Sequence, residues 1–311
     1  MTINPILKKM GFSEKDKVAI IHQDDVGITQ SSIDAFLELS DFGTISSGSA
    51  MVPAPWFPEA ARVSVENPNL DLGLHLVLNC EYEPYRWRPV STIDQSSGFI
   101  DENGYYKQDA QEVLKTGDPD CVAKEVLAQV KVARNFGVNP THIDAHSGIL
   151  WSGKFMDAYT DVYKKEQILP VLFKPGQQEL GNSMVQTLIK TFDISLEKVE
   201  AITSGGLPYV DSISGLPVNT AFDLDERMAL AKQILDSFQP GKLTHFAFHP
   251  MKNTPESWGL KRNSAARIGD YEVFMKKELK DYMKNSRIQL IGYKDILPYM
   301  DIPSKNTLYN S

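Results

Sequence analysis

Short apolar runs alternate with stretches of helical periodicity along most of the chain. The apolar runs are typical of buried strands and predict strands at residues 18–21, 44–52, 72–78, 142–144, 169–173, 243–248 and 288–292, with a weaker one at 207–210. Apolar side chains recur at steps of three or four positions in residues 122–133, 228–238 and 271–282, which predicts helices there. Asp118 and Pro119 precede the first of these helices as a capping residue and a helix-starting proline.

The order strand, helix, strand is typical of parallel βαβ units, so we expect an α/β fold. About seven such units favour one distorted, TIM-like (β/α) barrel over two separate domains. We therefore expect residues 1–311 to form a single domain, with two long loops at 79–118 and 250–264. In a barrel of this kind the chemistry gathers at the C-terminal ends of the strands.

Composition narrows the class of protein. The 311 residues are 42% hydrophobic and 23% charged, which excludes a disordered or fibrous chain. The net charge of −8 makes nucleic acid and anionic membranes poor partners. No apolar run reaches the ~18 residues of a membrane span, and the N-terminal residues contain no signal-peptide core. We expect a cytoplasmic protein whose two cysteines, Cys80 and Cys121, are reduced.

Five of the six histidines lie at or near a predicted strand's C-terminal end, and an acidic pair follows the first strand. Asp24 and Asp25 point to opposite faces in a regular strand, but a turn at the strand end lets both reach one site. Two adjacent carboxylates repel each other unless a cation or a shared proton relieves them. An alternative interpretation of the pair is a turn that caps the following helix.

The segment from His142 to His146 places two histidines and Asp144 on one face of a strand. Asp144, with His142 beside it, can orient a metal-binding histidine. Asp25, His75 and His146 would then form a two-histidine, one-carboxylate metal centre, a ligand set that suits Zn²⁺ and several other divalent ions. His75 on its own, in an apolar strand, is more typical of a buried core histidine than of a metal ligand. His249 would face the same barrel mouth as a candidate general acid.

These segments resemble those of the YdjC-like carbohydrate deacetylase family. Gln23–Ile28 resembles the N-A-D-D-F-G-L segment of that family, and Leu72–Leu78 resembles its G-x-H-L-x-L strand. Thr141–His146 is similar to its H-x-D-S-H-Q-H segment, and Phe248–Pro250 is similar to its H-P-G. A late R-x-x-E element resembles Arg267 with Glu272, at a longer spacing. The motifs follow the family order over residues 18–292.

The resemblance implies a (β/α) barrel with a divalent metal, usually Mg²⁺, held by Asp25, His75 and His146. It also implies that Asp24 is the base and His249 the acid. The implied reaction is hydrolysis of an N-acetyl group on an amino sugar or oligosaccharide, in some members a 6-phosphate. The chain departs from the family pattern at Val26, at Ser147–Gly148, at Phe173–Pro175 and at Met251.

Substrate contacts are expected from the long loops and from isolated cations. Trp87 and Trp258 would stack on sugar faces, whereas Arg86, Lys174 and Arg267 would meet an anionic group of the substrate. The loops would act as binding lids or would cap the barrel with a small core of their own. We expect a small carbohydrate as the partner and leave a homo-oligomer open. Two other functions stay open, a metal-dependent phosphoesterase and a non-catalytic sugar-binding module on the same scaffold.

Overall fold

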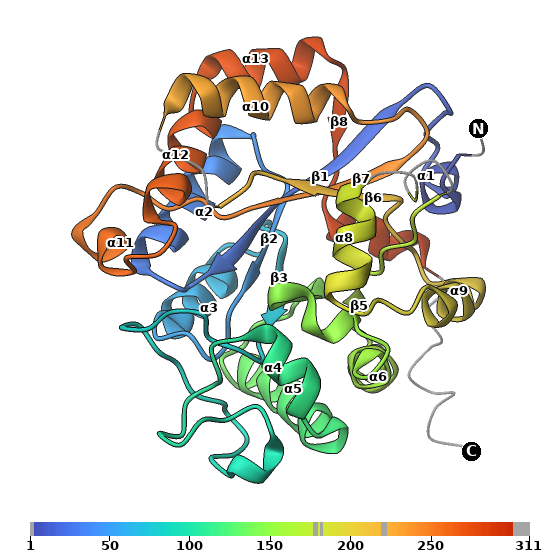
Figure 1. The fold of residues 1–311 in the computed structure, drawn as a ribbon. Coiled ribbons are helices and arrows are strands. Elements are labelled where there is room, and N and C mark those ends of the chain that lie inside the picture. Colours follow the sequence, from blue (N-terminus) through green and yellow to red (C-terminus); the bar gives the residue numbers. More distant parts are fainter. Residues whose placement is uncertain (1–2, 177–179, 181–182, 219–222, 301–311) are drawn as a thin grey trace.

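The computed structural model describes residues 3–176, 180, 183–218 and 223–300. A sheet of eight parallel strands forms its centre, with helices around it (Figure 1). The strands are β1 (Lys17–Val26), β2 (Ser47–Ala50), β3 (Leu72–Leu76), β4 (His142–Ala145), β5 (Leu169–Pro170), β6 (Ser212–Gly215), β7 (Leu243–Phe248) and β8 (Ile288–Leu290). Seven of them follow the order β5-β4-β3-β2-β1-β7-β6, and β8 pairs with β1. Every pairing is parallel, which confirms the predicted βαβ organisation.

A short irregular contact joins the two ends of this strand order. Phe173, just after β5, forms a parallel bridge with Val210, just before β6. Val210 N donates to Leu172 O over 2.8 Å, and Lys174 N donates to Val210 O over 3.0 Å. The result is a distorted (β/α) barrel, as predicted. The weaker strand at 207–210 supplies only this bridge, and the regular strand β6 begins at Ser212.

Helices connect the strands and cover the sheet. They are α1 (Pro5–Lys9), α2 (Gln30–Phe42), α3 (Phe57–Glu66), α4 (Ala110–Thr116), α5 (Pro119–Asn135), α6 (Met156–Glu166), α8 (Ser183–Thr191), α9 (Leu196–Ser204), α10 (Leu224–Asp236), α11 (Pro255–Gly259), α12 (Ser264–Phe274), α13 (Lys277–Asn285) and α14 (Tyr293–Ile296). Short 3-10 turns lie at Gln95–Ser97, His146–Trp151 and Leu297–Tyr299. Asp118 caps α5 as predicted, because its side chain accepts from Cys121 N. None of the helices in the described ranges has the length and apolar character needed to cross a membrane.

The loop 79–118 has a core of its own. Tyr82, Trp87 and Tyr106 are among the largest fully buried side chains. Glu125 of α5 is buried beneath them and accepts from Val90 N over 3.1 Å and from the Tyr106 hydroxyl over 2.6 Å. These contacts hold the loop against α5 in the outer helix layer, and the loop contains α4 near its C-terminal end. Packing therefore fixes the position of the loop beside the barrel mouth.

Candidate metal centre and active site

A bulge at the end of β1 brings both acidic residues to one site. The register between β1 and β2 shifts between Gln23 and Val26, so Asp24 and Asp25 lie in the irregular part of the strand. Asp25 has a φ of 60°, in the left-handed region that non-glycine residues rarely adopt. This conformation turns the two adjacent carboxylates into the same cavity. The helix that follows, α2, is capped by Thr29 and not by the acidic pair.

Asp25, His75 and His146 converge at this point. Asp25 Oδ1 lies 3.3 Å from His75 Nε2 and 3.2 Å from His146 Nδ1, and all three side chains are buried. The three potential ligand atoms lie within 4.8 Å of one another. Among the described residues, no donor makes a well-directed hydrogen bond to Asp25 Oδ1. Two imidazole nitrogens around a carboxylate oxygen that lacks such a donor fit a divalent metal ion.

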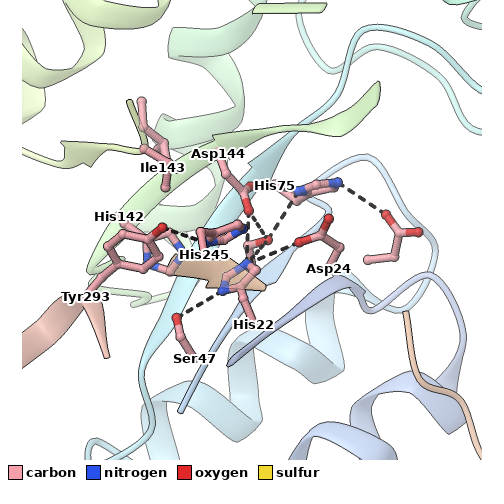
Figure 2. A network of polar contacts seen from close by, with 12 residues as sticks. His22, Asp24, Ser47, His75, His142, Ile143, Asp144, His245 and Tyr293 are labelled. Atoms are coloured by element: carbon pink, nitrogen blue, oxygen red, sulfur yellow. Dashed lines mark hydrogen bonds and ion pairs between the residues drawn. The ribbon is translucent and has the colours of Figure 1, made fainter. Parts of the chain in front are cut away.

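His75 is held from its far side by Asp144. His75 Nδ1 lies 2.7 Å from Asp144 Oδ1, and the other carboxylate oxygen lies 3.0 Å from His22 Nε2 (Figure 2). Ser49 Oγ also donates to Asp144 over 2.8 Å. Burial alone would lower the pKa of His75, but the Asp144 carboxylate raises it to about 9. Because Asp144 accepts the Nδ1 proton, Nε2 is the ring nitrogen of His75 that faces Asp25 and can bind a metal once it is deprotonated.

Asp24 and His249 form a second pair beside the first. Asp24 Oδ2 lies 3.7 Å from His249 Nε2, and Asp24 Oδ1 lies 3.3 Å from His22 Nε2. Burial raises the pKa of Asp24 to about 8, with help from the nearby Asp144 and Asp25 carboxylates. Burial also lowers the pKa of His249 to about 3, and the Arg267 guanidinium adds to that shift. The surroundings therefore favour the uncharged form of each group.

Helix α12 reaches the site from the opposite wall. Arg267 Nη2 lies 2.7 Å from Asp25 Oδ2. Burial alone would raise the pKa of Asp25, but Arg267 and His146 hold it well below its usual range. One turn later, Asp270 accepts from His249 N over 3.3 Å and from Arg227 Nε over 2.7 Å. The motif comparison paired Arg267 with Glu272, whereas the acid that contacts the site is Asp270, at the family's own spacing of three.

A cavity of about 550 Å³ opens above these groups. Its lining comprises Asp24, Asp25, His75, Asn79, Glu81, Gln108, Asp109, Ala110, His146, Ser147, Val218, His249, Arg262, Asn263 and Arg267. The volume is typical of a small-molecule site, and the lining is rich in groups that hydrogen-bond hydroxyls. A second cavity of about 600 Å³ shares Gln108 and Asp109 with the first and lies within loop 79–118.

The predicted substrate residues lie at different depths around this cavity. Arg267 lines it, whereas Arg86 lines the second cavity and pairs with Asp101 over 2.9 Å. Trp87 is only 2% exposed, and its ring centroid lies 6.3 Å from that of His146. Lys174 pairs with Glu200 over 2.8 Å, and Trp258 is 48% exposed; neither lines the cavity. Their contact with substrate stays a prediction.

His142, predicted to support the metal ligands, lies beneath them in the barrel interior. Its ring centroid is 5.0 Å from that of His22 and 4.1 Å from that of Tyr293. Tyr293 in turn donates or accepts a hydrogen bond of 2.7 Å with His245 Nδ1 (Figure 2). His142 thus packs under the network that orients Asp144, where its Nδ1 lies 2.9 Å from Thr141 Oγ1 and 3.7 Å from Asp71 Oδ1.

Sequence reasoning missed several groups in the cavity wall, above all Glu81. It follows β3 by five residues within the long loop, and its Oε2 lies 2.9 Å from His146 Nε2. Burial alone would raise the pKa of Glu81, but the His146 imidazole holds it below its usual range. Loop residues follow no hydrophobic period, so the only signal was an acidic residue soon after a strand that carries a histidine.

The buried pair of Arg267 and Asp25 gives a first prediction. Replacing Arg267 by Met leaves the Asp25 carboxylate buried without its cation, which costs about 3–5 kcal/mol for an ion pair of this kind. We expect urea unfolding of the metal-free protein to show that the free energy of unfolding of Arg267→Met is lower than that of wild type by this amount. Arg134→Met, at an exposed arginine of α5, is the control and should change stability by less than about 0.5 kcal/mol. A loss below about 1 kcal/mol in Arg267→Met would contradict the assigned pair.

A parallel barrel with two imidazoles and two carboxylates in a cavity at its C-terminal strand ends defines a barrel enzyme. The sequence profile described as YdjC-like protein matches residues 18–285, so the chain belongs to the YdjC-like protein family. The family resemblance drawn from the motifs is thereby confirmed.

Curated relatives carry a consistent name. The chain is 26% identical over 277 residues to a carbohydrate deacetylase of Thermoanaerobacter pseudethanolicus, covering 89% of this chain and 98% of the relative. It is 28% identical over 284 residues to a carbohydrate deacetylase of Listeria monocytogenes, covering 89% and 99%. The prediction of an enzyme of this type agrees with these names.

A solved structure supports the fold. The crystal structure of a putative cellobiose-phosphate cleavage protein from Enterococcus faecalis superposes with a TM-score of 0.70 at 19% identity. The alignment covers 90% of this chain and 99% of that one. At this identity the likeness confirms the barrel fold and nothing finer.

Proposed function

We propose that this protein is a carbohydrate deacetylase that hydrolyses the N-acetyl group of an amino sugar at a divalent metal centre. The observation that carries the proposal is the position of Asp24, beside Asp25, His75 and His146 and in the wall of the same cavity. A candidate base next to a candidate metal-binding set is the arrangement that hydrolysis of an amide needs. The names of the curated relatives support the same reaction.

Asp25, His75 and His146 would hold the metal. A bound divalent cation supplies Lewis acidity to the acetyl carbonyl and lowers the pKa of a bound water. Two imidazole nitrogens favour Zn²⁺ by ligand type, because Mg²⁺ prefers oxygen donors, whereas the family resemblance favours Mg²⁺. Asp144 keeps His75 in the tautomer that such a centre requires.

Asp24 and His249 would carry the protons. A divalent cation held by the neighbouring Asp25, His75 and His146 would lower the pKa of Asp24, and the ionised carboxylate would accept a proton from the attacking water. The 3.7 Å between Asp24 Oδ2 and His249 Nε2 gives that proton a short path to the imidazole. His249 then delivers a proton to the leaving amine as the C–N bond breaks. Asp270 holds the His249 backbone in place by accepting from its N–H. Acetate and the free amino sugar are the products.

The cavity lining would bind the sugar. Asn79, Gln108 and Asn263 offer amide groups for hydroxyls, and the exposed Arg262 offers a cation for an anionic substituent at the rim. Trp87 would act from behind His146 rather than by stacking on the sugar. In this proposal the sugar is bound mainly by hydrogen bonds to the polar lining of the cavity and not by stacking on a tryptophan ring.

The proposal is tested with a panel of N-acetylated amino sugars and short oligosaccharides, each with and without a 6-phosphate. Released acetate, free amine and inorganic phosphate are measured together. We expect equal amounts of acetate and amine, loss of the activity after chelation, and its return with Zn²⁺ or Mg²⁺. Phosphate without acetate would instead indicate the phosphoesterase, and sugar binding without any product would indicate the binding module.

A further inference from the structure

Each of the two histidines that face Asp25 has a carboxylate on its other ring nitrogen. For His75 the partner is Asp144, 2.7 Å from Nδ1, and it comes from a strand of the barrel. For His146 the partner is Glu81, 2.9 Å from Nε2, and it comes from the long loop 79–118. The two imidazoles therefore have matching surroundings, although only one of the carboxylates belongs to the barrel itself.

The backbone around Glu81 is held firmly. Cys80 N donates to Lys107 O over 2.9 Å, and the Tyr82 side chain is fully buried. Arg262, from the second long loop, donates from Nη1 to Glu81 O over 3.0 Å. Both long loops thus meet at Glu81, and the Glu81 side chain is 18% exposed at the inner wall of the cavity.

This contact determines which ring nitrogen of His146 is the donor. An ionised carboxylate only accepts hydrogen bonds, so the Nε2 of His146 must be the donor. When the ring gives up its other proton to bind a metal, its lone pair therefore lies on Nδ1, the atom that is 3.2 Å from Asp25 Oδ1. A ring oriented in this way presents its lone pair to the position between Asp25 and His75.

We propose that Glu81 is a positioning residue of the metal centre, which holds His146 through Nε2 and makes loop 79–118 part of that centre. The inference rests on the proposed function, because it requires that a metal binds between Asp25, His75 and His146. A histidine held by a carboxylate partner binds metal more tightly, and removal of such a partner costs about 10- to 100-fold in metal affinity.

The experiment measures Zn²⁺ dissociation constants by calorimetric titration of the metal-free full chain. Glu81→Ala should weaken binding by about 10- to 100-fold, and the isosteric Glu81→Gln, whose amide oxygen still accepts, should weaken it by less. The d–d absorption spectrum of the Co²⁺-loaded protein should shift in Glu81→Ala and return toward wild type in Glu81→Gln. Glu83→Ala, at an exposed acid of the same loop, should match wild type.

The outcomes distinguish a failure of the role proposed for Glu81 from a failure of the proposed function. If folded Glu81→Ala binds Zn²⁺ as tightly as wild type, the role of Glu81 is overturned while the metal centre stands. If Glu81→Ala does not fold, Glu81→Met, which has a similar volume but no acceptor oxygen, takes its place, and wild-type affinity together with an unshifted Co²⁺ spectrum in that variant overturns the role. If the wild-type chain binds no divalent ion, the proposed function fails and the inference fails with it.

Discussion

The Asp25→Asn variant is expected to lose its divalent metal and to lower acetate release by about 1000-fold or more. Asp25 Oδ1 lies 3.3 Å from His75 Nε2 and 3.2 Å from His146 Nδ1, and an amide oxygen is a much weaker metal ligand than a carboxylate. A bound metal ion stabilises the charge of the transition state by several kcal/mol, and each 1.36 kcal/mol corresponds to a factor of about ten in rate. Metal content by elemental analysis and acetate release by a coupled assay measure the two effects.

The matched control is Asp41→Asn, at an exposed aspartate on α2, which should keep both metal and activity. Asn at position 25 also removes the anionic partner of Arg267, so the far-UV circular dichroism of the variant should be recorded to show that it is folded. A folded Asp25→Asn protein that keeps one metal ion per chain and wild-type activity would contradict the assignment.

The Asp24→Asn variant is expected to keep its metal and to lower kcat by about 100- to 10,000-fold, the usual contribution of a positioned general base. The carboxylate of Asp24 lies beside the converging set, and its amide replacement cannot accept a proton from water. Steady-state kinetics give kcat and KM, and we expect the loss in kcat because the base acts on the reaction and not on sugar binding.

The adjacent variants are controls for each other, because Asp25→Asn should lose metal and activity together whereas Asp24→Asn should lose activity alone. If Asp24→Asn kept kcat within tenfold of wild type, another group would be the base. If it lost metal to the same extent as Asp25→Asn, Asp24 would belong to the metal-binding set.

The fold was predictable where its strands are buried and apolar, as in β7, and less so at β6, whose Ser212–Gly215 segment is half-buried and partly polar. The strand predicted at 243–248 matches β7 at both ends, and helix α5 begins at the predicted cap. The prediction at 44–52 was longer than β2, and the weak strand at 207–210 preceded β6. Strand ends depend on which neighbour is available for pairing, and a single sequence does not specify that neighbour.

The candidate site was predictable only where chemistry coincides with strand ends. Parallel strands end at one edge of the barrel, so Asp25, His75 and His146 were expected together, and the structure brings them together. The partner of Arg267 was not predictable, because its contact with Asp25 depends on how α12 packs across the barrel mouth. Glu81 was not predicted for a similar reason, because the geometry of its loop is set by contacts such as those of Cys80 and Tyr82.

The most direct test of the central claim is anomalous diffraction from crystals of the Zn²⁺-loaded protein, measured on both sides of the zinc absorption edge. We predict one strong peak within bonding distance of Asp25, His75 Nε2 and His146 Nδ1. A fully loaded crystal with no peak there, or with its peak in the deeper group of His22, His142 and Asp144, would contradict the assigned metal centre.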